Sequence, residues 1–214
     1  MSLEFDEPTH TYRWNGKVVP SVTQVLENVK IIDYDFIPHD TREMALERGR
    51  LVHQATHFDD EGDLDEATLD PMLAGYVAAA RNWQRDSGFQ VEADDAGKRF
   101  IEYRGFQEKF GYAGTLDRRG TIGVNGKRFA TVADYKTNDA PYWTAYQLAG
   151  YCAFFDSPRT FTRLAVELHA DGSYKVYEFD GKTWQQDFSV FLAALTVWKV
   201  KDEHNRTSNR RRAS

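Results

Sequence analysis

Residues 111–137 read GYAGTLDRRGTIGVNGKRFATVADYKT and predict a β-hairpin. At its centre, Asn125-Gly126 is the typical sequence of a type I′ turn, which requires a left-handed backbone at both residues. The runs on either side, 112–118 and 128–136, follow the period of two that strands have and are rich in residues that favour strands. The stretch therefore predicts two adjacent antiparallel strands around which the other elements are arranged.

The hairpin brings two acids and a lysine together. Alternate residues of a strand share a face, so Asp134 and Lys136 point the same way at the end of the second strand. Asp117 follows two glycines of the first strand, and glycine there allows a ligand to approach the backbone. Both carboxylates can therefore reach one cation, and a cation beside a lysine fits phosphodiester hydrolysis. Each feature alone also fits a structural role: an ion pair for Asp134–Lys136 and a strand-end turn for Asp117.

Two helices carry further polar residues at a spacing of four, which puts each pair on one helical face. Gln147 and Tyr151 are one pair, suited either to hydrogen-bonding a phosphate backbone or to bracing the lysine. His53 lies four residues after Gly49 and four before His57. Two histidines at this spacing form the zinc frame of metalloproteases, but Gln54 replaces the glutamate that such a site needs as its general base. His53 is therefore a candidate ligand of the same cation.

The remaining pattern predicts an α+β protein, because helices are followed by a run of strands and then by helix, hairpin and helix. An N-terminal hairpin turns at Asn15-Gly16, and a capping box at Ser21–Gln24 opens the first helix. The other expected helices are 41–58 with Asp40 as N-cap, 71–88 after the cap Asp70, 141–155 and 183–201. The other expected strands are 90–93, 98–104, 163–169 and 173–179.

Composition predicts one globular domain. The chain has 214 residues, 41% of them hydrophobic and 28% charged, with a net charge of -6. A negative total is compatible with a nucleic-acid enzyme whose carboxylates hold a cation, because binding depends on local basic patches. Apolar runs are too short to cross a membrane and the first residues lack a signal-peptide pattern, so a cytoplasmic location is expected. The single cysteine, Cys152, excludes an internal disulfide and a four-cysteine cluster.

Taken together, these residues resemble the RecB-like branch of the PD-(D/E)XK nuclease superfamily. The resemblance spans about residues 10–151. The motifs are G-x-x-x-H at 49–53, G-x-x-D at 114–117, D-Y-K-T at 134–137 and Q-x-x-x-Y at 147–151. The opening at 10–23 is similar to that of phage-encoded RecB-like exonucleases, and Glu102 matches an acid that precedes the glycine-rich segment in such enzymes.

The resemblance implies a restriction-endonuclease-like core, in which a central mixed sheet is flanked by helices and preceded by a helical segment. It implies Mg²⁺ or Mn²⁺ held by His53, Asp117, Asp134 and the carbonyl of Tyr135, with Glu102 as a further catalytic acid. Lys136 would position or deprotonate the attacking water. Gln147 and Tyr151 would support the site and contact DNA.

The resemblance implies that residues 1–202 form a single nuclease domain. Its parts are a hairpin and helix (1–30), a helical segment (38–88), the catalytic sheet and helix (89–180) and a C-terminal helix (181–202). A basic tail, 203–214, is expected to be disordered. The iron–sulfur cluster of some relatives is excluded by the single cysteine. No nucleotide-binding P-loop motif is present, so a helicase or recombinase partner would be a separate chain.

The expected function is metal-dependent DNA cleavage, with an exonuclease of DNA processing or recombination favoured. One alternative is a catalytically inactive DNA-binding module on the same fold, although decay usually removes an acid or the lysine and all are present here. Another is a protein-interaction domain that uses exposed aromatic residues. Exonuclease against endonuclease action, strand polarity, DNA against RNA and oligomeric state stay open at the level of sequence.

Overall fold

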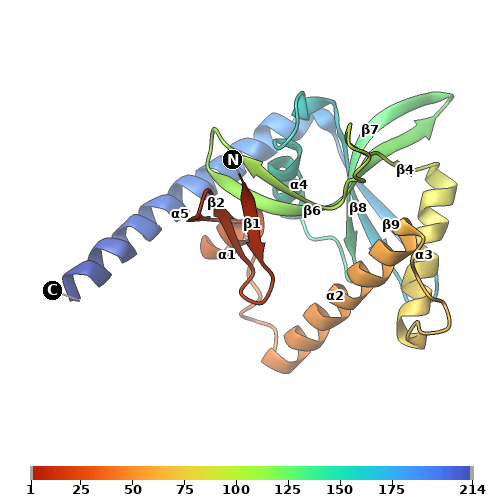
Figure 1. Ribbon diagram of the computed structural model, residues 1–214, viewed down its shortest axis with the longest axis horizontal. Coiled ribbons are helices and arrows are strands. Elements are labelled where there is room, and N and C mark those ends of the chain that lie inside the picture. The colour runs from red at the N-terminus through yellow and green to blue at the C-terminus, as the bar shows by residue number, and fades with distance from the viewer. Residues whose placement is uncertain (1, 213–214) are drawn as a thin grey trace.

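The computed structural model describes residues 2–212 and shows an α+β fold with a central mixed sheet flanked by helices (Figure 1). The six-stranded sheet has the order β4-β6-β7-β8-β9, and β5 pairs with β6 outside this path. The strands are β4 (Gln90–Val91), β5 (Ile101–Gln107), β6 (Tyr112–Val124), β7 (Lys127–Lys136), β8 (Thr162–Leu168) and β9 (Tyr174–Phe179). Because β7 and β8 are parallel and the other pairs antiparallel, the sheet is mixed, which confirms the expected fold class.

The predicted central hairpin is present. Asn125 and Gly126 have φ values of 50° and 74°, so both occupy the left-handed region that the turn requires. Pairing continues to Val124↔Lys127, directly at the turn. Strand β6 therefore extends well beyond the predicted end at residue 118, because a two-residue turn leaves no loop between the paired strands.

Helices cover both faces of the sheet, and a separate three-stranded sheet packs beside them. The helices are α1 (Val22–Asn28), α2 (His39–Glu61), α3 (Pro71–Ser87), α4 (Thr144–Cys152) and α5 (Trp184–Arg212), with short 3-10 turns η1 (Pro158–Thr160) and η2 (Gly181–Thr183). The small sheet comprises β1 (Leu3–Asp6), β2 (Thr11–Trp14) and β3 (Lys17–Val19). The expected hairpin at Asn15-Gly16 joins β2 and β3, and β1 is an additional strand.

Two hydrophobic clusters share the central strand β7. Val132 packs with residues of α1, α4 and α5, whereas Ala133 and Tyr135 pack with residues of α2 and α3. This alternation is the period of two that the sequence showed. It places Asp134 and Lys136 on the side of β7 that faces α4, and their neighbour Tyr135 on the side of α2.

Several element boundaries differ from the prediction. Helix α2 begins at His39 with Pro38 as its N-cap, so Asp40 lies in the first turn and is not the cap. Helix α4 begins at Thr144, because residues 141–143 form a turn in which the Thr144 N–H bonds the carbonyl of Pro141.

The expected disordered tail, 203–214, is helical in α5 as far as Arg212, and residues 213–214 lie outside the described residues. No glycine or proline follows Trp184 to stop the helix. Within residues 2–212, no helix is long and apolar enough to cross a membrane.

Candidate functional site

The candidate site lies in a fork between β6 and β7. Their pairing ends at Arg118↔Ala133, although β7 continues three residues further and β6 begins six residues earlier. Beyond this point β6 pairs with β5 on its other side. Asp117 reaches across the opening, where its Oδ2 accepts a hydrogen bond from the Tyr135 N–H at 2.7 Å. The two motifs of the predicted hairpin therefore meet where the strands separate.

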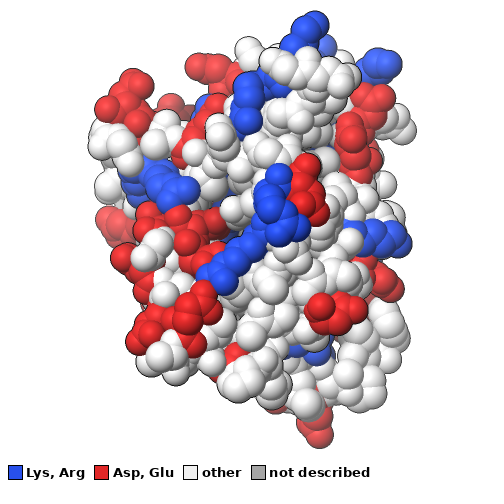
Figure 2. All heavy atoms as spheres, turned by 90° about the vertical axis from the view of Figure 1, so that its right-hand side faces the viewer, with Lys and Arg blue, Asp and Glu red and all other residues white. Residues whose placement is uncertain are grey.

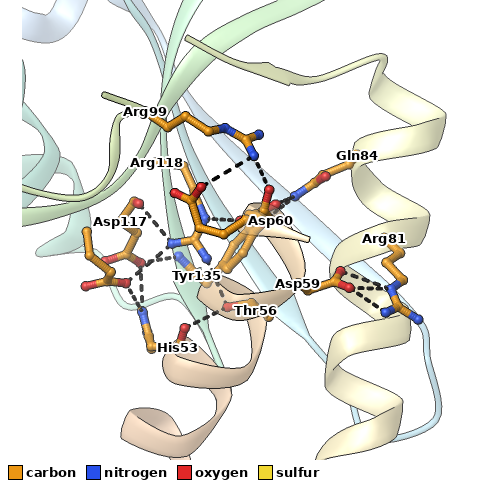
Figure 3. Close-up of polar contacts among 12 residues, drawn as sticks. His53, Thr56, Asp59, Asp60, Arg81, Gln84, Arg99, Asp117, Arg118 and Tyr135 are labelled. Carbon is orange, nitrogen blue, oxygen red and sulfur yellow. Dashed lines mark hydrogen bonds and ion pairs between the residues drawn. The ribbon is translucent and has the colours of Figure 1, made fainter. Parts of the chain in front are cut away.

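Three potential ligand side chains converge at the fork from three different elements. His53 comes from α2, Glu102 from β5 and Asp117 from β6, and one ligand atom of each lies within 4.8 Å of the others. His53 Nδ1 is 3.4 Å from Glu102 Oε1 and 3.5 Å from Asp117 Oδ2. Figure 3 shows His53 pointing from α2 towards Asp117. One imidazole nitrogen and two carboxylate oxygens at this separation form a donor set suited to a divalent cation.

Glu102 reaches the cluster through an unusual backbone conformation. Its φ is 46°, in the left-handed region, although it lies within strand β5 and is not glycine. Such a conformation costs roughly 1–3 kcal/mol and persists where surrounding structure enforces it. Here pairing of Ile101 with Arg118 and of Tyr103 with Leu116 holds both flanking residues. The sequence placed Glu102 before the glycine-rich segment but carried no signal of this conformation.

Arg118 is a site residue that sequence reasoning missed. Its side chain is fully buried, and its guanidinium donates to Asp60 Oδ2 at 2.5 Å, Glu102 Oε1 at 3.3 Å and Thr56 Oγ1 at 3.0 Å. Figure 3 shows these contacts joining β6 to the C-terminal half of α2. A buried cation needs such partners, so Arg118 both holds α2 against the sheet and fixes the Glu102 carboxylate. The only signal in the sequence was its place directly after Asp117.

Asp134 and Lys136 lie on one face, as predicted. Lys136 Nζ is 2.5 Å from Asp134 Oδ2, in a geometry that makes no regular hydrogen bond and leaves this buried oxygen without another partner. Burial alone lowers the pKa of Lys136, but the carboxylates of Asp134 and Asp117 outweigh burial and raise the pKa above its usual value. The lysine is therefore a cation at neutral pH.

Gln147 and Tyr151 lie beneath this lysine. Gln147 Oε1 accepts from Lys136 Nζ at 3.1 Å, and its Nε2 donates to the Tyr151 hydroxyl at 3.3 Å. Both side chains are buried, so the structure places them as braces of the lysine, and a direct contact with DNA stays a prediction. Gly114 permits this packing, because a Cβ there would lie 2.8 Å from the Tyr151 ring.

His57 does not join the cluster. Among the described residues, the group that could hold a metal contains His53 without its neighbour one turn along α2, and His57 Nδ1 is buried without a hydrogen-bond partner. A zinc frame requires both histidines on one ion. The geometry therefore gives no support to the metalloprotease interpretation.

The electrostatics of the cluster favour a bound cation. Burial and two neighbouring carboxylates outweigh the charge of His53 and raise the pKa of Asp117 to about 7. Burial lowers the pKa of His53, but Asp117 and Glu102 outweigh it and raise the pKa to about 9. The shift of Asp117 comes first from burial and then from the neighbouring acids, and the shift of His53 reflects the negative charge of the acids around it. A divalent cation in place of these protons would neutralise the same charge.

The donors present fit Mg²⁺ or Mn²⁺, with one change to the expected ligand set. His53 and Asp117 are together as expected, and Glu102 completes the compact group. Asp134 lies beside the group, and its Oδ2 is 2.5 Å from the Lys136 ammonium. The Tyr135 hydroxyl lies in the core, where it accepts from Gln84 at 3.1 Å, and the role of the Tyr135 carbonyl as a ligand stays a prediction. Hard oxygen donors with one imidazole suit either ion.

Comparison with known proteins does not identify a family for this chain, so the site is interpreted from its own residues. No family model matches the sequence, and no curated protein matches it. Among solved structures, the chain is similar to an alkaline exonuclease (LHK-Exo) from Laribacter hongkongensis, with 14% identity and a TM-score of 0.27. The match covers 61% of this chain and 69% of that chain. A likeness this distant carries no weight for fold or function.

Proposed function

We propose that this protein is a metal-dependent DNA nuclease of the RecB-like PD-(D/E)XK type. The observation that carries the proposal is the convergence of His53, Glu102 and Asp117 within 4.8 Å at the fork, where Lys136 and Asp134 end β7. Four separate motifs of the resemblance meet at one point in space. A structural ion-pair network would not need an imidazole, three acids and a braced lysine in the opening between two strands.

His53, Glu102 and Asp117 would hold the cation, with Asp134 as the adjoining acid. When bound, Mg²⁺ or Mn²⁺ supplies a Lewis acid for a phosphate oxygen and lowers the pKa of water. Asp117 is oriented for this role by the Tyr135 N–H, and Glu102 by the guanidinium of Arg118. The protein thus fixes the carboxylates before any substrate arrives, which is the preorganisation that a phosphoryl-transfer site requires.

Lys136 would act as a cation and not as a base. Its raised pKa keeps the ammonium charged, and Gln147 and Asp134 hold it at 3.1 and 2.5 Å. A fixed positive charge stabilises the negative charge that builds on the phosphate in the transition state. Loss of one such group typically lowers kcat by about 10²–10³-fold.

The inactive DNA-binding alternative is less favoured by this geometry. In support of an active enzyme, the acids and the lysine that the proposed hydrolysis would use are all present, with His53, Glu102 and Asp117 converging beside the Asp134–Lys136 pair. An exonuclease acting in DNA processing or recombination remains our preferred assignment, in which any helicase or recombinase would be a separate chain.

The test is cleavage of three end-labelled DNAs, linear duplex, linear single strand and closed circle, with Mg²⁺, Mn²⁺ or EDTA. We expect metal-dependent loss of linear DNA, abolished in Asp117→Asn and Lys136→Ala. Asp171→Asn, in the exposed β8–β9 turn, is the matched control and should keep wild-type activity. Nicking of the closed circle would assign an endonuclease at the same site. Wild-type turnover by Asp117→Asn would refute the site.

A further inference from the structure

A wide cleft opens beside the group formed by His53, Glu102 and Asp117. It has a volume of about 1370 Å³ and is bounded by the segment 30–37, the N-terminal half of α2 and the segment 135–143. His53 and Lys136 line it, whereas Glu102 and Asp117 line a smaller neighbouring pocket, so the cleft meets the candidate site at one edge. Pockets for small ligands measure about 300–1,000 Å³, and this volume exceeds that range. The dimensions suit a segment of a polymer.

Exposed aromatic side chains line this cleft. Phe36 is 80% exposed and Tyr142 68% exposed, and they lie on the two segments that bound the cleft. The Tyr142 hydroxyl donates to the carbonyl of Ile31 at 3.3 Å, which ties the two segments together. Large apolar rings that stay open to water do not gain the free energy of burial, and a patch of such side chains is typical of a binding site. Flat, exposed rings are the surfaces on which unpaired bases stack.

Two arginines of α2 line the same cleft and make no direct ion pair within the part of the chain that the structure describes. Among the described residues, Arg42 and Arg48 form no ion pair with a carboxylate, and the Nε atom of each is buried without a hydrogen bond. Arg48 donates only to the amide oxygen of Asn138, at 2.6 Å. In a chain with a net charge of -6, most cations could find an acid. These two are available to a phosphate, which a guanidinium binds in a bidentate manner.

A row of rings and cations leads from the metal cluster into the cleft. Lys136 Nζ lies 5.1 Å from the Trp143 ring, whose centroid is 6.4 Å from that of Tyr34. The guanidinium of Arg42 lies 5.3 Å from the Tyr34 ring. Lys136, which is expected to contact the cleaved phosphate, and Arg42, which could bind a neighbouring phosphate, therefore lie along the same wall of the cleft.

A different face of the molecule offers a contrast. Figure 2 shows the side that lies at the right of Figure 1, where α3 is, and acidic and basic side chains are interspersed there. For example, Arg81 of α3 pairs with Asp59 of α2 and with Glu66 of the segment between the two helices. Arg81 is thus already neutralised by acids, and on this face the cations that Figure 2 shows lie next to acidic side chains.

We propose that the cleft binds an unpaired DNA strand, with bases stacked on Phe36 and Tyr142 and phosphates held by Arg42 and Arg48. The assignment of this strand as substrate rests on the proposed nuclease function, whereas its binding does not. An unpaired strand is favoured over a duplex because base faces are covered by neighbouring base pairs in a duplex and only edges and phosphates are open. The cleft would thus select single strands or frayed ends.

The experiment measures binding in EDTA, where metal-dependent cleavage cannot occur. Fluorescence anisotropy of the full chain compares three labelled probes: an oligothymidylate, an abasic oligomer of equal length and a blunt duplex. We expect the oligothymidylate to bind most tightly. Phe36→Ala should weaken that binding by about 5- to 150-fold, the range for loss of one stacked base, and leave binding of the abasic oligomer unchanged. Arg42→Ala should weaken binding of both single-stranded probes.

Matched controls lie on the β6–β7 hairpin, outside the cleft. Phe129 is 43% exposed, so Phe129→Ala removes an exposed ring, and Lys127→Ala removes an exposed cation. Both should bind the three probes as wild type does. Circular dichroism and thermal melting confirm that each variant folds, which is expected because Phe36, Phe129 and Lys127 are exposed and Arg42 is only half-buried.

Several outcomes would overturn the proposal. Equal affinity for the oligothymidylate and the abasic oligomer would show that bases do not stack in the cleft. Tighter binding of the duplex would contradict the preference for an unpaired strand. A fourth labelled probe, an oligouridylate, tests the class of nucleic acid, and its tighter binding than that of the oligothymidylate would reassign the cleft to RNA. Self-association that Phe36→Ala abolishes, without oligonucleotide binding, would make the cleft a protein interface. Binding as expected with no cleavage in Mg²⁺ would support this inference and count against the nuclease alone.

Discussion

The two halves of helix α2 differ in how their polar side chains are satisfied. In the C-terminal half, Val52, Ala55 and Thr56 are buried against the sheet, and His53 and Asp60 have partners on β5 and β6. In the N-terminal half, Met44 and Leu46 are 73% and 58% exposed, and Arg42 and Arg48 make no direct ion pair with an acid among the described residues. One continuous helix therefore contributes a preorganised ligand to the cluster and an open wall to the cleft.

This difference indicates two kinds of binding. Buried charges must be paired within the protein, so the C-terminal half is committed to one geometry and can hold a small cation at a defined point. The N-terminal half carries the exposed apolar side chains of Met44 and Leu46 and two half-buried arginines that make no direct ion pair within the described residues, so it suits a flexible polymer whose sequence varies. The comparison can be tested by substitutions in each half.

The largest expected effect is on folding. Arg118→Met removes the guanidinium that anchors the C-terminal half of α2 and leaves Asp60 buried without its partner. Breaking a buried pair in this way costs about 3–5 kcal/mol, or roughly 6–20 °C in Tm for a chain of this size. The matched control is Arg81→Met. Arg81 of α3 pairs with Asp59, which lies on α2 next to Asp60, but this pair is more exposed and should contribute at most about 1 kcal/mol to the free energy of unfolding. Equal losses in thermal melting would contradict the division of α2 into two halves.

The next effect is on metal dependence. His53→Ala should raise the Mn²⁺ concentration for half-maximal cleavage by about 10- to 100-fold, because one of the three converging ligands is lost. His57→Ala, one turn further along α2, should leave that concentration near the wild-type value because His57 lies outside the group of ligands. Titration of activity with Mn²⁺ measures both. A larger effect of His57→Ala would instead support a site that uses both histidines.

A smaller effect concerns stability against pH in the metal-free protein. The pKa of Asp117 is raised to about 7 in the fold, above its value in an unfolded chain. A carboxyl with a raised pKa contributes stability that is fully present below the unfolded pKa and is lost as pH rises through about 7. Asp117→Asn avoids this loss, so at pH 8 in EDTA its Tm should exceed that of wild type by about 2–4 °C, corresponding to roughly 1 kcal/mol. The difference should shrink towards pH 4 and disappear with saturating Mn²⁺, and a constant difference would refute the linkage.

The smallest effect belongs to the N-terminal half of α2. Arg48→Ala should weaken oligothymidylate binding only a few-fold but reduce the dependence of log affinity on log salt concentration by about 0.7, the value for one phosphate contact on a single strand. Folding should not change, because the side chain is only half-buried and has no acidic partner. An unchanged salt dependence would remove Arg48 from the phosphate path and make the two halves of α2 more alike than we infer.

Local patterns in the sequence were sufficient to predict much of the fold. The Asn125-Gly126 turn, the alternation along β7 and the Ser21 capping box depend only on neighbouring residues, and each is present in the structure. The same reasoning placed Asp134 and Lys136 on one face. It failed at the ends of helices, as in α4 and α5, because a helix continues or stops according to packing and capping that extend beyond a short window.

What the sequence by itself determined is the hairpin, its alternating faces and the residue types available for a cation, because turn chemistry and strand period act between near neighbours. Only the tertiary structure decided that Glu102 joins His53 and Asp117, that Arg118 contacts Glu102 and that α2 forms the wall of a cleft. Those contacts join residues 16 to 62 positions apart, as Arg118 does with Glu102 and Thr56. Such contacts arise because burial in a shared core forces distant polar groups to find one another, and no local pattern encodes which partner will be close.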